Sequence, residues 1–247
     1  MSNGVVVPAY VHPLVDPAQW RLVERLGRGW TCVVVNVADG PGADRPVDPA
    51  YVRLLGRLVT AGVRAAGYVD LDYGARDAAA VRRDIATWRE RYGIDAVFFD
   101  QYPCSVDAGV AAVVARGRAD GVVLVVANPG VHPAPGALAG VDVCVTFEGD
   151  WAAYRRLAVP AWTHPDARPV HLVHGVPRSA SEALQELAAR RGTPCYATQA
   201  SGANPWRRVS TLVAGGAERR RPEPDHGAVQ ATTRSRRRAG SRGGAVR

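Results

Sequence analysis

Two apolar segments of the sequence each end in a carboxylate, and these two acids are the first candidates for chemistry. Residues 94–102 run through four consecutive apolar residues into Asp100, and residues 141–148 end in Glu148. A short apolar run bounded by turn-forming residues is typical of a buried strand. Parallel sheets bind their ligands where the strands end. The pattern therefore predicts that Asp100 and Glu148 lie at the ligand-binding edge of a sheet.

A pair of carboxylates at such an edge suits glycoside hydrolysis, in which one protonates the leaving oxygen and the other acts as base or nucleophile. If the acids end strands four and six, their Cα atoms should lie about 9–10 Å apart, given a strand spacing of ~4.8 Å. That distance leaves both retaining and inverting mechanisms open. The alternative interpretation is that each acid caps the next helix or pairs with an arginine.

Strand alternation predicts which side chains accompany Glu148. Thr146 and Cys144 should share its face of the sheet. Phe147 and Val145 should point to the opposite face. By the same argument, the odd separation of His171 and His174 sends these two histidines to opposite faces, so they are not expected to form a metal site.

Further polar residues at the expected strand ends are candidates for binding the ligand. They are rich in amides, phenols and acids and poor in cations, which suits sugar hydroxyl groups better than phosphate. Two aromatic members, Tyr102 and Trp151, are expected to offer stacking surfaces. The candidate substrate-binding residues are Tyr10, His12, Asn36, Asp70, Tyr73, Gln101, Tyr102, Asn128, Trp151, His174 and Gln199.

The elements that must position these residues follow a strand–helix rhythm. Eight apolar runs begin at intervals of roughly 20 to 30 residues, with helical patterns between them. The runs are nearly continuously apolar, as in strands covered on both faces. We therefore expect an α/β protein with a closed (β/α)8 TIM-like barrel as a single domain over residues 1–215, in preference to an open doubly wound sheet. The expected strands are 4–10, 31–37, 63–69, 94–100, 121–127, 141–148, 170–174 and 194–198, and a last helix is expected at 206–213.

The basic residues limit the possible chemistry. The chain has 247 residues and a formal net charge of +8, and all 31 of its basic residues are arginine. Without lysine there is no Schiff base, no lysine-anchored pyridoxal phosphate and no Walker A motif. Nine arginines and only three acids fall within residues 217–247. We therefore expect an Arg-rich disordered tail at 216–247, and no nucleic-acid partner except through that tail.

The spacing of the cysteines and the length of the apolar runs indicate in which cellular compartment the protein is expected. The four cysteines form no CxxC or CxxH arrangement, so we expect free thiols in a reducing compartment and neither metal nor cofactor. No run approaches the ~18 apolar residues of a membrane span. The first residues lack the basic and apolar regions of a signal peptide. These features predict a cytoplasmic protein without a membrane partner, unless it is exported by a non-classical route or its start codon is mis-assigned.

Five segments of the sequence resemble the spherulin-4 family in their order and spacing. They are VPAYVHP, NVADGPG, GYVDLDYGAR, VFFDQY and CVTFEGDW, and the resemblance covers about residues 4–210. It implies a (β/α)8 barrel, and members of that family include glycoside hydrolases that cleave galactosaminogalactan, an α-1,4-linked polymer of galactose and N-acetylgalactosamine. It also implies that Asp100 matches the Asp of the family's Asp-Glu motif and that Glu148 matches a further family Glu. Gln101 stands where that motif has its Glu.

The glutamine leaves two interpretations of function open. In the first, Asp100 and Glu148 suffice to hydrolyse a polysaccharide or oligosaccharide that contains galactosamine or N-acetylgalactosamine. In the second, the chain is a catalytically weak or inactive carbohydrate-binding barrel. Gln101 can hydrogen-bond a sugar hydroxyl, but an amide neither donates a titrating proton nor acts as a base. A carbohydrate is the expected partner in both.

Overall fold

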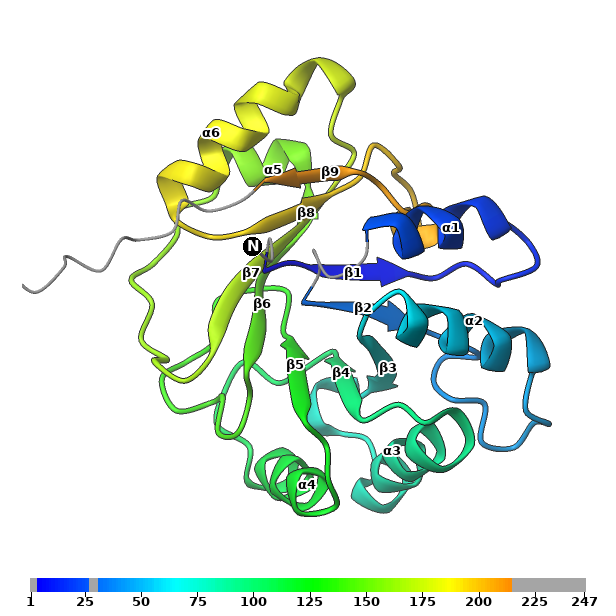
Figure 1. Ribbon diagram of the computed structural model, residues 1–247. Helices are drawn as coiled ribbons and strands as arrows, with labels where there is room; N and C mark the ends of the chain where they lie inside the picture. Colours follow the sequence, from blue (N-terminus) through cyan, green and yellow to red (C-terminus); the bar gives the residue numbers. More distant parts are fainter. Residues whose placement is uncertain (1–3, 27–30, 215–247) are drawn as a thin grey trace, which may run out of the picture. The chain divides into compact units, whose positions relative to one another are not determined.

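The computed structural model describes residues 4–26 and 31–214 of the chain, whose strands form one curled sheet (Figure 1). Neighbouring strands follow the order of the chain from β1 to β9. The first eight are parallel, and β9 pairs antiparallel with β8. The strands are β1 (Val6–Ala9), β2 (Cys32–Val35), β3 (Ala65–Asp70), β4 (Ala96–Asp100), β5 (Leu124–Asn128), β6 (Val143–Asp150), β7 (Arg168–His174), β8 (Cys195–Ala197) and β9 (Leu212–Ala214).

The helices lie outside the curled sheet (Figure 1). Several begin after an aspartate whose carboxylate accepts a backbone N–H of the first turn, which is a preferred way to start a helix. Asp48, Asp77, Asp107 and Asp150 fill this position. The α-helices of the described ranges are α1 (Pro17–Leu26), α2 (Pro49–Thr60), α3 (Ala78–Tyr92), α4 (Ala108–Ala119), α5 (Trp151–Arg156) and α6 (Ser181–Arg191).

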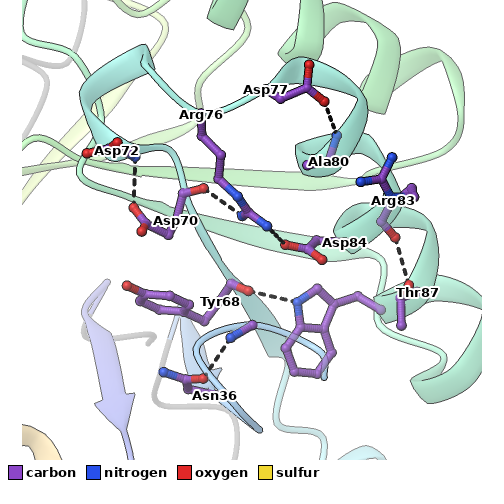
Figure 2. Close-up of polar contacts among 12 residues, drawn as sticks. Asn36, Tyr68, Asp70, Asp72, Arg76, Asp77, Ala80, Arg83, Asp84 and Thr87 are labelled. Carbon is purple, nitrogen blue, oxygen red and sulfur yellow. Dashed lines mark hydrogen bonds and ion pairs between the residues drawn. The ribbon is translucent and has the colours of Figure 1, made fainter. Parts of the chain in front are cut away.

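The contact between α3 and β3 fixes one strand that reaches the site. A Cβ atom at Gly67 would lie 2.5 Å from the indole ring of Trp88, so only glycine lets that ring lie against the strand. The indole N–H of Trp88 also donates to the carbonyl of Tyr68 at 2.8 Å (Figure 2). Because Trp88 is fully buried, this contact holds the backbone of β3 firmly at Tyr68.

The eight predicted parallel strands are present, but the expected closed ring is not what the hydrogen bonds of the described residues show. Their strand ladder does not join β1 to β8 or β9. Instead, the backbone N–H of Tyr10, just after β1, donates at 3.1 Å to the carbonyl of Trp206. Trp206 belongs to a single 3-10 turn, η4 (Pro205–Arg207). A turn thus connects the first strand to the chain that follows β8.

The predicted helix at 206–213 is wrong. After η4 the chain extends and forms β9. Residues 209–213 include valine, serine and threonine, and β-branched residues favour extended backbone. The free edge of β8 then offers hydrogen-bond partners to this segment. The helical spacing of apolar residues in this segment gave no indication that it would pair with β8 instead.

All four cysteines are free, and three of them are buried. Within residues 4–26 and 31–214, no helix is both long and apolar enough to cross a membrane. The predicted tail at 216–247 lies outside the described residues.

Candidate active site

The side-chain amide of Asn128 lies between the two predicted catalytic acids. Its Nδ2 donates to Asp100 Oδ1 at 2.7 Å and to Glu148 Oε2 at 2.6 Å. Since both distances start at one nitrogen, the two oxygens lie no farther apart than the two bonds laid end to end, about 5.3 Å. The three residues come from consecutive strands, β4, β5 and β6. The predicted meeting of Asp100 and Glu148 at one edge of the sheet is therefore what the structure shows.

Two further donors hold the outer oxygens of these carboxylates. The hydroxyl of Tyr68 donates to Asp100 Oδ2 at 2.9 Å. The indole N–H of Trp206 donates to Glu148 Oε1 at 2.7 Å. Every oxygen of the acid pair therefore accepts a hydrogen bond from a side chain, which fixes the plane of each carboxylate. Both acids remain partly exposed to solvent.

An irregularity in β6 turns Glu148 toward this cluster. Val145 pairs with Val170 of β7, but the next paired residue, Phe147, aligns with His171. Thr146 is therefore the extra residue of a β-bulge. Because the bulge shifts the alternation by one, Val145 and Glu148 share a face of the sheet.

The prediction for the neighbours of Glu148 is thus partly wrong. Val145 lies on the same face as Glu148 instead of the opposite one, because the bulge interrupts strict alternation. Phe147 does point away, and its ring packs against Tyr154 of α5. His171 packs against the same Tyr154 on that outer side. His174 faces Trp206, so the prediction that the two histidines point to opposite faces is confirmed.

The electrostatics of the pair favour protonation. Burial raises the pKa of the Asp100 carboxyl, although hydrogen bonds from Tyr68, Asn128 and the backbone of Gln101 oppose this. Burial also raises the pKa of Glu148, and the charge of Asp100 raises it further, against the bonds from Asn128 and Trp206. Two carboxylates this close cannot both ionise freely, so one holds a proton to a higher pH than an isolated acid would.

The alternative interpretation of these acids, as helix caps or arginine partners, does not match their contacts. The carboxylates that cap α4 and α5 belong to Asp107 and Asp150. None of the ion pairs within residues 4–26 and 31–214 includes Asp100 or Glu148. Their hydrogen-bond donors are neutral groups, so neither acid is neutralised by a fixed cation.

Several predicted binding residues lie around the acid pair. Tyr10 is one, since burial and then the charges of Asp100 and Glu148 raise the pKa of its phenol well above the usual value. Asp70 stands beside Asp100 in the β3–β4 ladder, and its Oδ1 accepts a backbone N–H at 2.8 Å (Figure 2). His174 contacts the indole ring that holds Glu148, and its Nδ1 is buried without a partner in the described structure.

The loop after β3 meets the loop after β4 beside Asp100. The backbone N–H of Tyr73 donates to the carbonyl of Gln101 at 2.8 Å. Both residues have left-handed backbone, with φ of 52° and 48° respectively, which side chains other than glycine adopt rarely. The side chain of Tyr73 is 64% exposed. That of Gln101 is partly exposed and makes no hydrogen bond to other described residues, so neither side chain is committed within the described structure.

Five predicted binding residues instead contact groups other than the two acids. Tyr102 and Trp151 do not offer the expected stacking surfaces near the acids. Tyr102 is 1% exposed, and its hydroxyl donates to the carbonyl of Ala137. Trp151 packs on Tyr154 outside the sheet. His12 bonds the carboxylate that caps α2, Asn36 accepts a turn N–H, and Gln199 accepts from Arg178.

The sequence interpretation did not identify Tyr68 and Trp206 as site residues. Tyr68 precedes Asp70 by two positions, so strand alternation already put it on the same face. Nothing local indicated Trp206, which fell in the segment wrongly predicted to be a helix. Its partner, Glu148, is 58 positions away.

Comparisons with known proteins identify the family to which this fold belongs. The model of a family described as spherulation-specific family 4 matches residues 4–217. Spherulin-4 of Physarum polycephalum is 31% identical over 150 residues, which cover 58% of this chain and 44% of that protein. The chain thus matches less than half the length of this curated relative.

Solved structures of two other proteins have a similar fold. The crystal structure of Aspergillus clavatus Sph3 in complex with GalNAc superposes with a TM-score of 0.65 at 25% identity, covering 87% of this chain and 93% of Sph3. A noncanonic maltogenic α-amylase, AmyB of Thermotoga neapolitana, has a TM-score of 0.50 at 12% identity, covering 79% and 67% of the two chains. The second likeness concerns the fold alone. The likeness to Sph3 supports a carbohydrate-active fold.

Proposed function

We propose that this chain, which belongs to spherulation-specific family 4, is a glycoside hydrolase acting on a saccharide that contains galactosamine or N-acetylgalactosamine. The single observation that carries this proposal is the amide of Asn128, which holds Asp100 and Glu148 together at one edge of the sheet. The GalNAc bound to the similar Sph3 supports this class of sugar. The family resemblance of the VFFDQY and CVTFEGDW segments points to the same two acids.

The surroundings of the two acids favour different roles. Asp100 accepts hydrogen bonds from Tyr68, Asn128 and the backbone of Gln101, and each of these stabilises its anion. Glu148 is raised in pKa by burial and then by the charge of Asp100. Glu148 accepts two such hydrogen bonds, from Asn128 and Trp206, and lies beside the charge of Asp100, so we propose that it holds the proton that the pair retains. We assign Glu148 as the proton donor and Asp100 as the nucleophile.

The separation of the acids supports a retaining reaction. Retaining enzymes hold their carboxyl groups about 5–5.5 Å apart, whereas inverting enzymes need about 6.5–9.5 Å to admit a water. The two oxygens that Asn128 bridges lie no more than about 5.3 Å apart, and this close approach favours the shorter class. Asp100 attacks the anomeric carbon, the glycosidic bond breaks, and the Glu148 proton passes to the leaving oxygen. Water then attacks the glycosyl ester, gives its proton to Glu148 and releases the sugar and the Asp100 carboxylate.

The second candidate function is carbohydrate binding without turnover. Gln101 supports it, because it stands beside Asp100 where the family resemblance implies a glutamate. Its side chain makes no hydrogen bond to other described residues and is partly exposed. An amide in that place can bind a sugar hydroxyl but cannot exchange a proton with it.

One experiment separates the two functions. Purified protein is titrated with N-acetylgalactosamine oligosaccharides while reducing ends are measured in the same samples. A hydrolase releases new reducing ends in proportion to enzyme and time. A binding protein shows saturable binding without releasing reducing ends. In that case the Gln101→Glu variant tests whether the missing acid explains the lack of hydrolysis.

A further inference from the structure

A pocket lies at the same edge of the sheet as the acid pair, beyond the end of β8. It encloses about 530 Å³ between the loop after β8, the segment around η4, and α1. Its lining is polar and cationic and contains no aspartate or glutamate. The lining residues used below are Arg178, Thr198, Ser201, Arg207, Arg208 and Ser210.

We propose that this pocket binds the anionic group of an acidic saccharide, either the carboxylate of a uronic acid or a sulfate or phosphate ester. Three guanidinium groups line one concavity, and none of them belongs to an ion pair within the described chain. Arg178 donates to Gln199 through Nε, which leaves its terminal nitrogens uncommitted. The side chains of Arg207 and Arg208 make no hydrogen bond or ion pair with any described residue. Guanidinium groups repel one another and match the paired oxygens of such anions, so a bound anion stabilises this arrangement.

Hydroxyl groups complete the set of donors. Thr198 Oγ1 accepts the backbone N–H of Ala200 at 3.1 Å, and Ser210 Oγ accepts that of Leu212 at 3.0 Å. A hydroxyl that accepts in this way still has its own O–H to donate. Ser201 is exposed at the same rim. The pocket thus offers charged and neutral donors together, without a carboxylate that would repel the ligand.

The pocket adjoins the acid pair through η4. Trp206 holds Glu148 and is followed directly by Arg207 and Arg208 of the pocket. Thr198, at the end of β8, bonds the backbone of Val173, next to His174, whose ring faces Trp206. A saccharide held at the acid pair is therefore positioned to extend an acidic substituent past Trp206. This connection to saccharides rests on the proposed function, whereas anion binding by itself does not.

Calorimetric titration tests the pocket with three probes: tetragalacturonate, a neutral N-acetylgalactosamine tetramer, and inorganic sulfate as competitor. The wild type should bind the acidic tetramer about tenfold more tightly than the neutral one. The double variant Arg207→Gln/Arg208→Gln should lose that preference and keep the affinity for the neutral tetramer. Sulfate should compete with tetragalacturonate in the wild type and not in the variant. Added salt should weaken only the acidic interaction.

The matched control removes the same charge elsewhere. Arg82 and Arg83 are exposed on α3, so the Arg82→Gln/Arg83→Gln variant should retain the preference for the acidic tetramer. The inference is overturned if both double variants lose the preference for the acidic tetramer equally. It is also overturned if sulfate does not compete with tetragalacturonate for the wild type. Asp100→Asn should leave the preference intact. A chain that never hydrolyses but keeps the preference refutes only the proposed hydrolysis, and an active chain without the preference refutes only this inference.

Discussion

Trp206 and Glu148 are joined by a hydrogen bond of 2.7 Å across 58 positions of sequence. This bond ties the turn after β8 to the strand end that carries one of the two acids. The same turn accepts the N–H of Tyr10 after β1. One residue, Trp206, therefore contacts both the chain after β1, through its backbone carbonyl, and the candidate active site, through its indole.

Replacement of Trp206 by phenylalanine removes this donor and keeps an aromatic ring. The indole N–H stabilises the Glu148 carboxylate and so lowers its pKa. Without it the pKa rises, and the alkaline limb of kcat/KM, where the proton donor is lost, should move to higher pH. We also expect kcat to fall about tenfold, because Glu148 loses one of its two orienting bonds. An alkaline limb that stays in place would contradict the role of Glu148 as proton donor.

Replacement of Tyr68 by phenylalanine makes the corresponding change at Asp100. The Tyr68 hydroxyl lowers the pKa of that carboxyl, so its removal should shift the acidic limb of kcat/KM to higher pH. The alkaline limb should not move. A pH profile measured on both variants tells the acids apart: if Tyr68→Phe moves the alkaline limb and Trp206→Phe the acidic one, the two roles are reversed.

The partly buried acid pair should lower the free energy of unfolding as the pH rises. Both carboxyls have a folded-state pKa above the usual value, so the folded state holds protons that the unfolded state has released. Stability then falls as the pH rises through this interval. Glu148→Gln removes the charge, and its free energy of unfolding should exceed that of the wild type at pH 8, by on the order of 1 kcal/mol. Urea denaturation at pH 4 and pH 8 measures this difference in free energy of unfolding. The advantage of the variant over the wild type should be smaller at pH 4 than at pH 8. A variant that is less stable than the wild type at pH 8 contradicts the electrostatic account.

The short separation of the acids predicts retention at the anomeric carbon. Proton NMR of the first product formed from an α-linked N-acetylgalactosamine oligosaccharide should show the α-anomer before mutarotation. Initial formation of the β-anomer would mean that water attacks directly, and that the acids move apart when the substrate binds.

The sequence was informative where the structure depends on local patterns. Apolar runs ending in Asp100, Asn128 and Glu148 are visible within ten residues each, and parallel strands bring such ends to one edge. The amide that bridges the acids was predicted as a site residue, although its role between them was not. That role depends on the register of β4 with β5, where Asp100 aligns with Asn128.

Features set by distant contacts were not predictable in this way. The bulge at Thr146 follows from pairing with β7, not from the residues around it. The segment around Trp206 has no strong local preference, and its turn and strand form because β8 and Glu148 offer partners. Tyr102 ends an apolar run like the other candidates, but the loop at Ala137 seals it from solvent.

Reducing-end release from galactosaminogalactan, measured for the wild type and three folded variants, tests the central claim most directly. Asp100→Asn and Glu148→Gln should each lower the rate by at least about a hundredfold, because each removes one half of the acid–nucleophile pair. Asp95→Asn makes the same change at the exposed residue just before β4 and should keep the wild-type rate. If the wild type is active and both site variants cleave at its rate, Asp100 and Glu148 are not the catalytic acids.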